Sequence, residues 1–532
     1  MTEAARKELE RLLRRFAESR QKLSVDRYRP LYHFVSPECG LNDPNGICFW
    51  RGRWHLFYQG YREDGPCPVW GHAISDDLIH WRDLQYALVP PGPGHGCWSG
   101  STLVEEDRVI AIYYAHPLGN SVAVADDPQL SNWRRISDQV VIPCAVPIWT
   151  AATGHEGGET SRVLHRAPPP AGAINFVYDP CIWRRDGVYY SLSGGTVPHG
   201  PSGRRMRAEY LYRSTDLVSW EYMHPFIEGD IYGIAGDDGG CPYFWPIGDR
   251  HILLHFSHRT GAHYLLGDYD TDRDKFVVTY GGRFTFGAYS PGGVHAPSAT
   301  PDGQGGVIAI FNVNKGKPTP GWDQIMSLPR RLTLIGRDDL GVEPAGDIGS
   351  LRGAHQHLKA MALPANREIV MDGVQGDAIE IGAEIETGLA QTIELNVLRS
   401  PGKQEFTRIA FYRQRGCINW DRSDGWDGAS ESRDSILAID TSYSSELPDV
   451  ESRPPELAPV YLAPGSPLKL RVFVDRSVVE VFANGRQCAT VRVYPGRADS
   501  LGVSMRAQGA DAELRALDVW QMHSIYERQS RE

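Results

Sequence analysis

An acidic side chain in a tight turn is the first candidate for chemistry in this sequence. The stretch 41–46 reads Leu-Asn-Asp-Pro-Asn-Gly and places Asp43 just ahead of an alternating strand pattern that runs to Gln59. Asn, Pro and Gly favour defined turn conformations, so this stretch aims the Asp43 carboxylate in one direction. Turn chemistry alone selects the same residue types, and a solvated Asx-Pro turn between two strands is the alternative interpretation.

A weak internal repeat indicates the fold of the region after the N-terminal helix. Segments 75–81, 125–133, 214–220 and 269–276 each carry one to three acidic residues followed by a Trp or Phe. A strand, an acidic hairpin and a strand with an aromatic residue, repeated at roughly 50 residues, are typical of a β-propeller blade. Propeller strands converge on a funnel, where carboxylates from different blades can meet. A favourable hairpin sequence is the alternative for any single copy.

The pattern changes after the propeller-like region. Glycine-rich and then short helical sequence at 344–362 indicates an interdomain linker. From about Arg367, alternating strands resume with turn clusters and no helical period, which predicts a second, all-β sandwich. We therefore expect an N-terminal amphipathic helix at 1–24, a propeller domain at 25–345, a linker at 346–366 and a β-sandwich at 367–532.

Composition and charge exclude several classes of protein. The chain has 532 residues, too many for one ordinary core, and a net charge of -11, which argues against nucleic acid or an anionic membrane as partner. Nine scattered cysteines without a CxxC pair predict reduced, mostly buried thiols.

The first residues lack an apolar leader and instead show helical spacing of apolar side chains, so we expect a surface helix and a cytoplasmic location.

Several short motifs follow one another in a fixed order. The turn at 41–46 is followed by His-Leu-Phe-Tyr-Gln at 55–59, Trp-Gly-His-Ala at 70–73 and Trp-Ser-Gly-Ser at 98–101. Further motifs lie at 321–330 and 473–485. In order and spacing these motifs resemble glycoside hydrolase family 32, the invertases, inulinases, levanases and other β-fructofuranosidases, over about residues 30–525. With the N-terminal helix, the resemblance implies an all-β fold, a five-bladed β-propeller followed by a C-terminal β-sandwich.

The resemblance implies glycoside hydrolysis with retention. One carboxylate attacks the anomeric carbon and a second carboxyl group, about 5 Å away, protonates the leaving oxygen. Asp43 matches the family's nucleophile. Asp179, in the run Phe-Val-Tyr-Asp-Pro at 176–180, matches the carboxylate that stabilises the charged transition state, with a turn at a strand end as the alternative. The family has an Arg before the latter residue, whereas this chain has Tyr178, so one cation that binds sugar hydroxyls is missing.

The expected acid/base is also missing. The family carries it in a Glu-Cys-Pro motif, and here the stretch 240–242 reads Gly-Cys-Pro. Glycine cannot transfer a proton, and losing general-acid help costs about 10² to 10⁴ in rate. Asp238 or Asp237 could reach the same point because the two following glycines permit unusual backbone geometry, and we take Asp238 as the acid. A solvated turn is the alternative for this stretch, and more distant candidates for the acid are Glu228, Asp230 and His295.

The same motifs supply the expected binding residues. Asn42 and Gln59 would bind hydroxyls, Ser99 would bind at the rim, and Tyr178 and Asp237 complete the polar set. Trp70 and Trp98 would form apolar walls against the sugar, with packing in the propeller core as the alternative.

We therefore expect a retaining hydrolase of β-D-fructofuranosides such as sucrose, fructooligosaccharides or fructan. It would act on a small-molecule carbohydrate without a cofactor or metal, and the inserts at 153–173 and 197–207 would set linkage and chain length. One alternative is a catalytically weak or inactive carbohydrate-binding homologue; another is a fructosyltransferase or other furanosidase. We expect no nucleic-acid or membrane partner, while the helix and the sandwich each offer a surface for a homo-oligomer.

Overall fold

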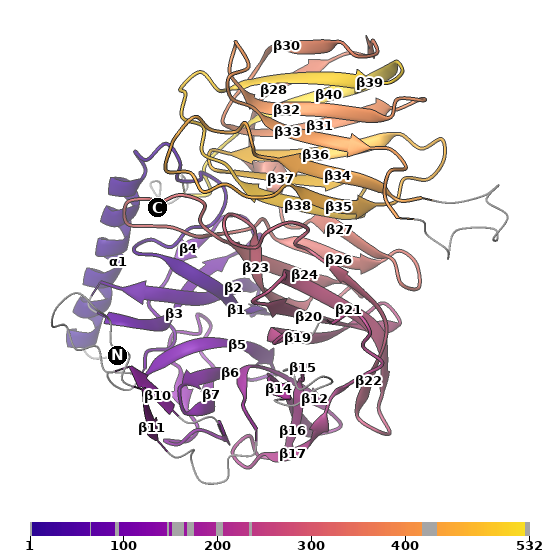
Figure 1. Cartoon of the computed structure of the whole chain (residues 1–532). Helices are drawn as coiled ribbons and strands as arrows, with labels where there is room; N and C mark the ends of the chain where they lie inside the picture. Colours follow the sequence, from indigo (N-terminus) through magenta and orange to yellow (C-terminus); the bar gives the residue numbers. More distant parts are fainter. Residues whose placement is uncertain are drawn as a thin grey trace.

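The fold is a propeller of five sheets followed by a sandwich of two larger sheets, with a helix ahead of them (Figure 1). The computed structural model describes residues 3–63, 65–90, 95–145, 148–151, 164–167, 175–197, 206–233, 237–417 and 433–526. The prediction of an all-β chain with a five-bladed propeller, a C-terminal sandwich and a short N-terminal helix is confirmed.

The blades follow one another along the chain. The first contains β1 (Leu41–Trp50), β2 (Arg53–Arg62), β3 (Gly65–Ser75) and β4 (Arg82–Asp83). The second contains β5 (Gly96–Val104), β6 (Val109–His116), β7 (Gly119–Ala125), β8 (Arg134–Arg135) and β9 (Ile142–Pro143). The third contains β12 (Tyr178–Arg185), β13 (Val188–Gly194), β16 (Tyr210–Ser214) and β17 (Glu221–Pro225).

The last two blades complete the circle. The fourth contains β19 (Gly240–Ile247), β20 (Arg250–Ser257), β21 (Gly261–Asp270), β22 (Lys275–Arg283) and β18 (Ile227–Glu228). The fifth contains β23 (Val294–Pro301), β24 (Val307–Val313), β25 (Ile325–Met326), β26 (Arg330–Leu334) and β27 (Leu340–Pro344). Two short pairs lie in the connections: β10 (Ile148–Ala151) with β11 (Leu164–Ala167), and β14 (Thr196–Val197) with β15 (Met206–Arg207).

The first strands of the five blades form a closed ring. β1 contacts β5, β5 contacts β12, β12 contacts β19, β19 contacts β23, and β23 returns to β1. Because each inner strand is flanked by the inner strands of two neighbouring blades, side chains at the starts of these strands can gather around one axis.

The acidic repeat marks the hairpin between the third and fourth strands of a blade. In the first blade, the Asp77 carboxylate accepts hydrogen bonds from the backbone N–H groups of Ile79 and His80. Asp216 makes the equivalent two bonds in the hairpin between β16 and β17. The carboxylate supplies acceptors that the turn backbone lacks, which explains why an acidic residue recurs there.

The helix α1 (Glu3–Leu23) lies along the first blade (Figure 1). On its inner face, Phe16 is buried and packs edge-on against Tyr86, with ring centroids 5.6 Å apart. Arg20 forms a buried ion pair with Asp83 of β4 at 2.5 Å. The predicted amphipathic helix is therefore anchored to the propeller by an apolar and a charged contact.

The sandwich packs two antiparallel sheets around one apolar core. One sheet contains β28 (Arg352–Leu358), β29 (Met361–Leu363), β40 (Ala512–Met522), β31 (Ala378–Glu386), β36 (Leu468–Asp475), β37 (Val478–Ala483) and β38 (Gln487–Arg492). The other contains β30 (Glu368–Gln375), β39 (Gly502–Gln508), β32 (Thr392–Arg399), β33 (Thr407–Tyr412), β34 (Ser435–Asp440) and β35 (Glu456–Val460). The segment 346–366 differs from the expected linker, because its strands β28 and β29 pair with β40 and so belong to the sandwich.

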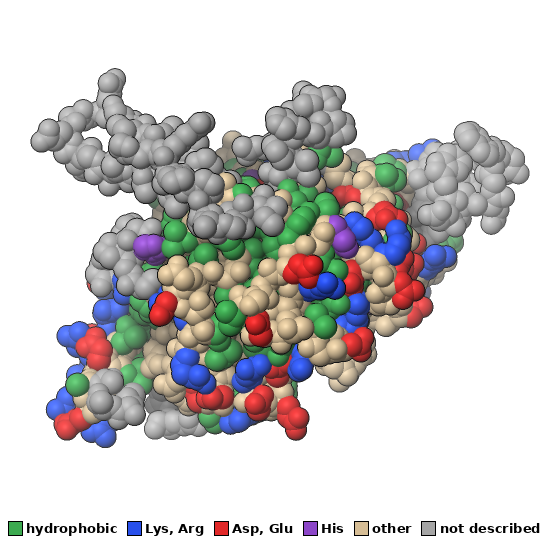
Figure 2. Space-filling view, turned by 90° about the horizontal axis from the view of Figure 1, so that it is seen from below, with side chains coloured by type: hydrophobic (Ala, Val, Ile, Leu, Met, Phe, Trp, Pro, Cys, Tyr) green, Lys and Arg blue, Asp and Glu red, His purple; other side chains and the backbone are tan. Residues whose placement is uncertain are grey.

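The cysteines, the surface charges and the helix of the structure can each be compared with the expectations from the sequence. All nine cysteines are free, and most are buried. On the face shown in Figure 2, acidic and basic side chains are interspersed among apolar and neutral ones. Within the described ranges, the structure contains no helix with the length and apolarity that a membrane span requires.

A buried charge network joins the two domains. The Asp475 carboxylate accepts hydrogen bonds from the backbone N–H groups of Leu31, Tyr32 and His33 and contacts His33 Nδ1 at 2.8 Å. On the other side of the ring, His33 Nε2 lies 3.6 Å from Glu480. Burial alone would lower the pKa of His33, but the hydrogen bond to Asp475 and the negative charges of Asp475 and Glu480 raise it to about 9. The network thus holds a buried imidazolium.

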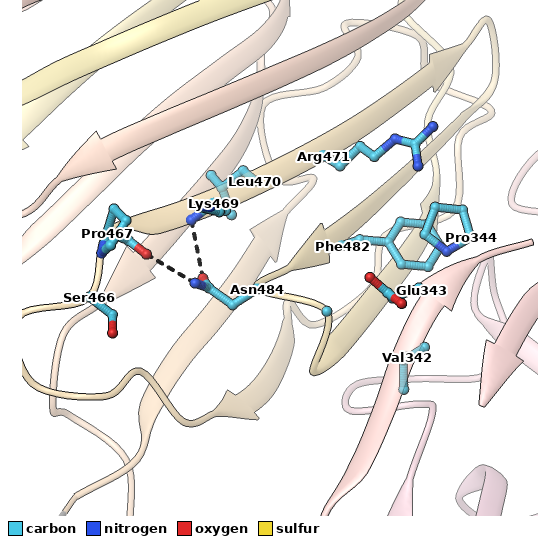
Figure 3. Close-up of a pocket in the computed structure, with 11 residues that line it drawn as sticks. Val342, Glu343, Pro344, Ser466, Pro467, Lys469, Leu470, Arg471, Phe482 and Asn484 are labelled. Atoms are coloured by element: carbon cyan, nitrogen blue, oxygen red, sulfur yellow. Dashed lines mark hydrogen bonds between the residues drawn. The ribbon is translucent and has the colours of Figure 1, made fainter. Parts of the chain in front are cut away.

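A groove remains open where the last blade meets the sandwich (Figure 3). Glu343 and Pro344 line it from β27, and Lys469 and Arg471 line it from β36. The Asn484 amide at its end donates to the Pro467 carbonyl at 3.0 Å. The buried contacts between the domains therefore give way to an open groove with a carboxylate on the propeller side and two cationic side chains on the sandwich side.

The His33 network predicts a pH-dependent stability. Replacing Asp475 by Asn leaves the buried imidazolium without its main partner, which costs about 3–5 kcal/mol when a buried pair is broken, so the Tm should fall by several degrees. Because the folded pKa of His33 is raised, its contribution is complete below about pH 6.5 and is lost as the pH rises through about 9.

Thermal unfolding at pH 6.5 and at pH 9.5 measures both effects. The wild type should lose more Tm than Asp475→Asn over this interval. Glu221→Gln, which breaks an exposed ion pair with Arg213, is the matched control and should change the Tm little. Equal pH dependence in the wild type and Asp475→Asn would contradict the assignment.

Candidate active site

Each inner strand of the propeller breaks register close to its start. The shifts lie between Leu41 and Pro44, Cys97 and Gly100, Tyr178 and Pro180, Gly240 and Tyr243, and Val294 and Pro297. A β-bulge leaves residues out of the ladder and re-aims their side chains. The residues inside these five breaks include Asn42, Asp43, Trp98, Ser99, Asp179, Cys241 and His295. Bulges therefore bring side chains from every blade to one end of the ring.

Asp43 lies at the centre of this set. Its side chain is only 7% exposed and accepts hydrogen bonds from Gln59 Nε2 at 2.9 Å and Ser99 Oγ at 2.6 Å. His295 Nδ1 lies 3.1 Å from its other oxygen. Burial opposes ionisation, but the hydrogen bond and charge of His295, together with the Ser99 hydroxyl, hold the pKa of Asp43 below its ordinary value. The carboxylate is thus ionised and fixed in orientation.

Asp179 approaches Asp43 from the third blade. The Cys241 thiol lies 3.6 Å from Oδ2 of Asp43 and 3.6 Å from Oδ2 of Asp179, so the two carboxylates flank one sulfur atom. Burial and the negative charge of Asp43 raise the pKa of Asp179 to about 7. Burial also raises the pKa of Cys241 well above its ordinary value, so a neutral thiol separates the two acids.

Gly240 lies directly beside Asp179. A Cβ atom at this position would lie 3.3 Å from Asp179 Oδ2 and 3.7 Å from the Phe256 carbonyl oxygen. A side chain at 240 would therefore point into the site, and the chain has none there.

The two aspartates before Gly240 face different ways. Asp238 accepts hydrogen bonds from the backbone N–H of His258 at 3.0 Å and from its ring Nδ1 at 2.5 Å. Asp237 is buried beside Ser257 and Arg207, and burial raises its pKa. Asp237 thus interacts with Ser257 and Arg207, and its predicted role as a substrate-binding residue stays a prediction.

The other predicted binding residues divide between the site and the core. Gln59 and Ser99 contact Asp43, and Asn42 accepts a hydrogen bond from Asn312 at 3.0 Å. Trp98 is 37% exposed and remains a candidate wall.

Trp70 and Tyr178 have mainly structural contacts. Trp70 is fully buried and donates to the Trp98 carbonyl at 2.8 Å, so it supports Trp98 from the core and cannot itself form a wall. The Tyr178 hydroxyl donates to the backbone carbonyl of Asp238 and so fixes the stretch ahead of β19.

Sequence reasoning missed two members of the site. Cys241 has a signal, because it stands in the Gly-Cys-Pro stretch, whereas His258 lies in no motif. His295 was expected only as a distant candidate for the acid, and it contacts Asp43 directly. Two other distant candidates lie in ion pairs, Glu228 with Arg273 and Asp230 with Arg207. The inserts expected at the funnel mouth fall largely outside the described residues.

Family comparison agrees with both domains. The family model described as "Glycosyl hydrolases family 32 N-terminal domain" matches residues 33–344, and "Glycosyl hydrolases family 32 C terminal" matches residues 347–521. The two matches meet where β27 ends and the sandwich begins.

Individual proteins with similar sequences include a levanase of Bacillus subtilis (strain 168), 26% identical, with 94% of this chain and 71% of that protein covered. A raffinose invertase of Escherichia coli is 27% identical, with 94% and 97% covered. Among solved structures, fructan 1-exohydrolase IIa from Cichorium intybus shares the fold with a TM-score of 0.75 at 20% identity, covering 94% of this chain and 98% of that one.

Proposed function

Because this chain belongs to glycosyl hydrolase family 32, we propose that it hydrolyses β-D-fructofuranosides with retention of configuration. The observation that carries the proposal is the convergence of Asp43 and Asp179, from different blades, on the Cys241 thiol. Relatives named levanase and raffinose invertase support this class of substrate.

Asp43 has the properties of a nucleophile. Its carboxylate would attack the anomeric carbon of the fructosyl unit while the bond to the leaving oxygen breaks, and water would then release the sugar from the ester. The hydrogen bonds from Gln59, Ser99 and His295 keep the carboxylate ionised and leave it no rotational freedom. This fixed geometry supports attack along one direction.

Asp179 has the properties of a charge stabiliser. The transition state of glycoside cleavage is oxocarbenium-like, and an ionised carboxylate beside the ring lowers its energy. Asp179 lies beside the nucleophile and, among the residues that the structure describes, receives only the backbone N–H and the thiol of Cys241 as donors. Its negative charge is therefore left largely available to the sugar.

Gly240 favours a second candidate function. A propeller of this family without an acid at that position could bind a fructoside and turn it over only slowly, or could pass the fructosyl unit to another sugar. A cytoplasmic location also stays a proposal, which the nine free cysteines support.

Replacing Asp43 by Asn should abolish turnover. Loss of the nucleophile is expected to lower kcat by about 10⁴-fold or more, with sucrose binding retained because the amide keeps the shape of the carboxylate. Initial rates of fructose release and calorimetric binding measure the two effects. Asp126→Asn, at an exposed ion pair with Arg134, is the control and should keep full activity.

Product stereochemistry tests retention separately. With methanol present as acceptor, the wild type should form the methyl β-fructofuranoside, observed by NMR. Formation of the α-anomer would exclude an Asp43 ester, and wild-type protein that releases no fructose from sucrose, a fructooligosaccharide or an activated fructoside would contradict the proposed hydrolase.

Asp179 should set the acidic side of the pH profile. Its carboxyl group must be ionised to stabilise positive charge, and its pKa is raised to about 7, so kcat/KM should fall as the pH drops through about 7. Tyr178→Arg places a cation beside Asp179 and should move this limb to lower pH, whereas Tyr178→Phe should leave it in place. A limb that Tyr178→Arg does not move would assign it to another group.

A further inference from the structure

A histidine of the fourth blade lies close to Gly240. Gly240, the first residue of β19, pairs with Phe256 of β20. Just outside the two strands, Asp238 precedes Gly240 by two residues and His258 follows Phe256 by two, and the two side chains are joined by a hydrogen bond. Position 240 borders Asp179, because a Cβ there would lie 3.3 Å from Asp179 Oδ2. The Asp238–His258 pair therefore lies next to the strand start that borders Asp179.

Asp238 fixes the orientation of the His258 ring. Its carboxylate takes the backbone N–H of His258 with one oxygen and ring Nδ1 with the other, at 3.0 and 2.5 Å. The Tyr178 hydroxyl holds the Asp238 carbonyl from behind. Because Nδ1 is engaged, Nε2 is the ring nitrogen that remains available for exchange of a proton.

The surroundings place this ring next to the nucleophile. The His258 ring lies edge-on to His295, with centroids 6.2 Å apart, and His295 Nδ1 is 3.1 Å from the Asp43 carboxylate. The Phe256 ring lies edge-on at 4.8 Å on another side. The His258 side chain is 64% exposed, so the ring also opens to solvent.

The charged groups around His258 favour its cationic form. The hydrogen bond to Asp238 outweighs burial, and the charges of Asp238, Asp179 and Asp43 add to it, so the pKa of His258 is raised. His295 is the other titratable side chain in ring contact. His258 therefore keeps its proton to higher pH than an ordinary histidine.

We propose that His258 is the general acid/base of this chain and that Asp238 is its positioning residue. The proposal rests on the proposed hydrolysis of fructofuranosides. It replaces direct proton transfer from Asp238, whose two carboxylate oxygens are both engaged by His258.

The proton balance follows the two halves of the reaction. As an Asp43 oxygen bonds to the anomeric carbon and the glycosidic C–O bond breaks, His258 Nε2 gives its proton to the leaving oxygen and becomes neutral. In the second half, neutral Nε2 takes a proton from water, the water oxygen bonds to the anomeric carbon, and the Asp43 carboxylate is released.

The test compares two leaving groups in the variant His258→Asn. The Asn amide can keep a hydrogen bond to Asp238 but has no acidic proton. For sucrose, whose leaving alkoxide needs a proton, kcat/KM should fall about 10² to 10⁴-fold. For β-D-fructofuranosyl fluoride, whose leaving group needs little help, it should fall less than about 10-fold.

The pH dependence of kcat/KM for sucrose tests the role of His258 independently of the size of any loss of activity. With sucrose, the wild type should show an alkaline limb as His258 loses its proton, and His258→Asn should not. In Asp238→Asn, the pKa of His258 loses its main support, so the limb should move to lower pH. The double variant Gly240→Glu/His258→Asn should recover part of the sucrose activity if a carboxyl group at 240 can donate the missing proton.

His80→Asn is the matched control. His80 binds Asp77 in the same way, through its backbone N–H at 2.8 Å and ring Nδ1 at 2.7 Å, but in an outer hairpin of the first blade. His80→Asn should leave the ratio of kcat/KM for sucrose to kcat/KM for the fluoride unchanged.

Equal losses on sucrose and on the fluoride in His258→Asn would overturn the proton-donor role, and so would an alkaline limb that persists in that variant. Persistence of the limb would point to Asp179 as the acid. If the wild type hydrolyses neither substrate, the proposed function itself fails; if it hydrolyses both and His258→Asn does too at wild-type rates, only the role of His258 fails.

Discussion

The site depends on five interruptions of the β-ladder at the inner ends of the blades. Asp179 and Cys241 adopt left-handed backbone angles, with φ of 45° and 48°, which cost non-glycine residues about 1–3 kcal/mol each. The ring around them holds these angles in place. The Tyr243 hydroxyl accepts from the Gly46 N–H at 3.0 Å and donates to the Gly100 carbonyl at 2.7 Å, so one phenol ties three blades together beneath the bulges. Closure of the propeller thus stabilises a backbone that no isolated blade would keep.

The same geometry separates the behaviour of two chemically identical side chains. Asp43 receives donors from its own blade, from the second through Ser99 and from the fifth through His295, and these outweigh burial. Asp179 has few donors among the described residues, so burial and the charge of Asp43 dominate its ionisation. Two carboxyl groups with opposite shifts of pKa can take different roles in one reaction. The neutral thiol of Cys241 lets them lie close without a third charge between them.

Local patterns predicted the fold class and Asp43 as a site candidate, because turn residues and strand alternation act over a few positions. Asp179 was predicted only through the resemblance to the family. Local patterns failed where pairing between segments far apart in the sequence determines the structure. Segment 346–366 looked like a linker, yet β28 and β29 join the sandwich through β40, more than a hundred residues away. Trp70 sits in a motif, but only its packing shows that it lies in the core.

His258 shows the limit most clearly. Tyr243 pairs with Leu254, and that register would bring Arg259 opposite Asp238. The bulge between Gly240 and Tyr243 shifts the pairing by one residue and brings His258 there instead. A one-residue shift of this kind leaves no local signature in the sequence.

The two departures from the family motif are physically linked. A glutamic acid that donates its proton becomes an anion beside the two aspartates, and a nearby arginine offsets the added charge. This chain has neither group, with Gly240 and Tyr178 in their places. A histidine donor changes the balance, because an imidazolium that gives up its proton becomes neutral and adds no negative charge next to Asp179. The loss of the arginine is then tolerable, since the charge that it would have offset never forms.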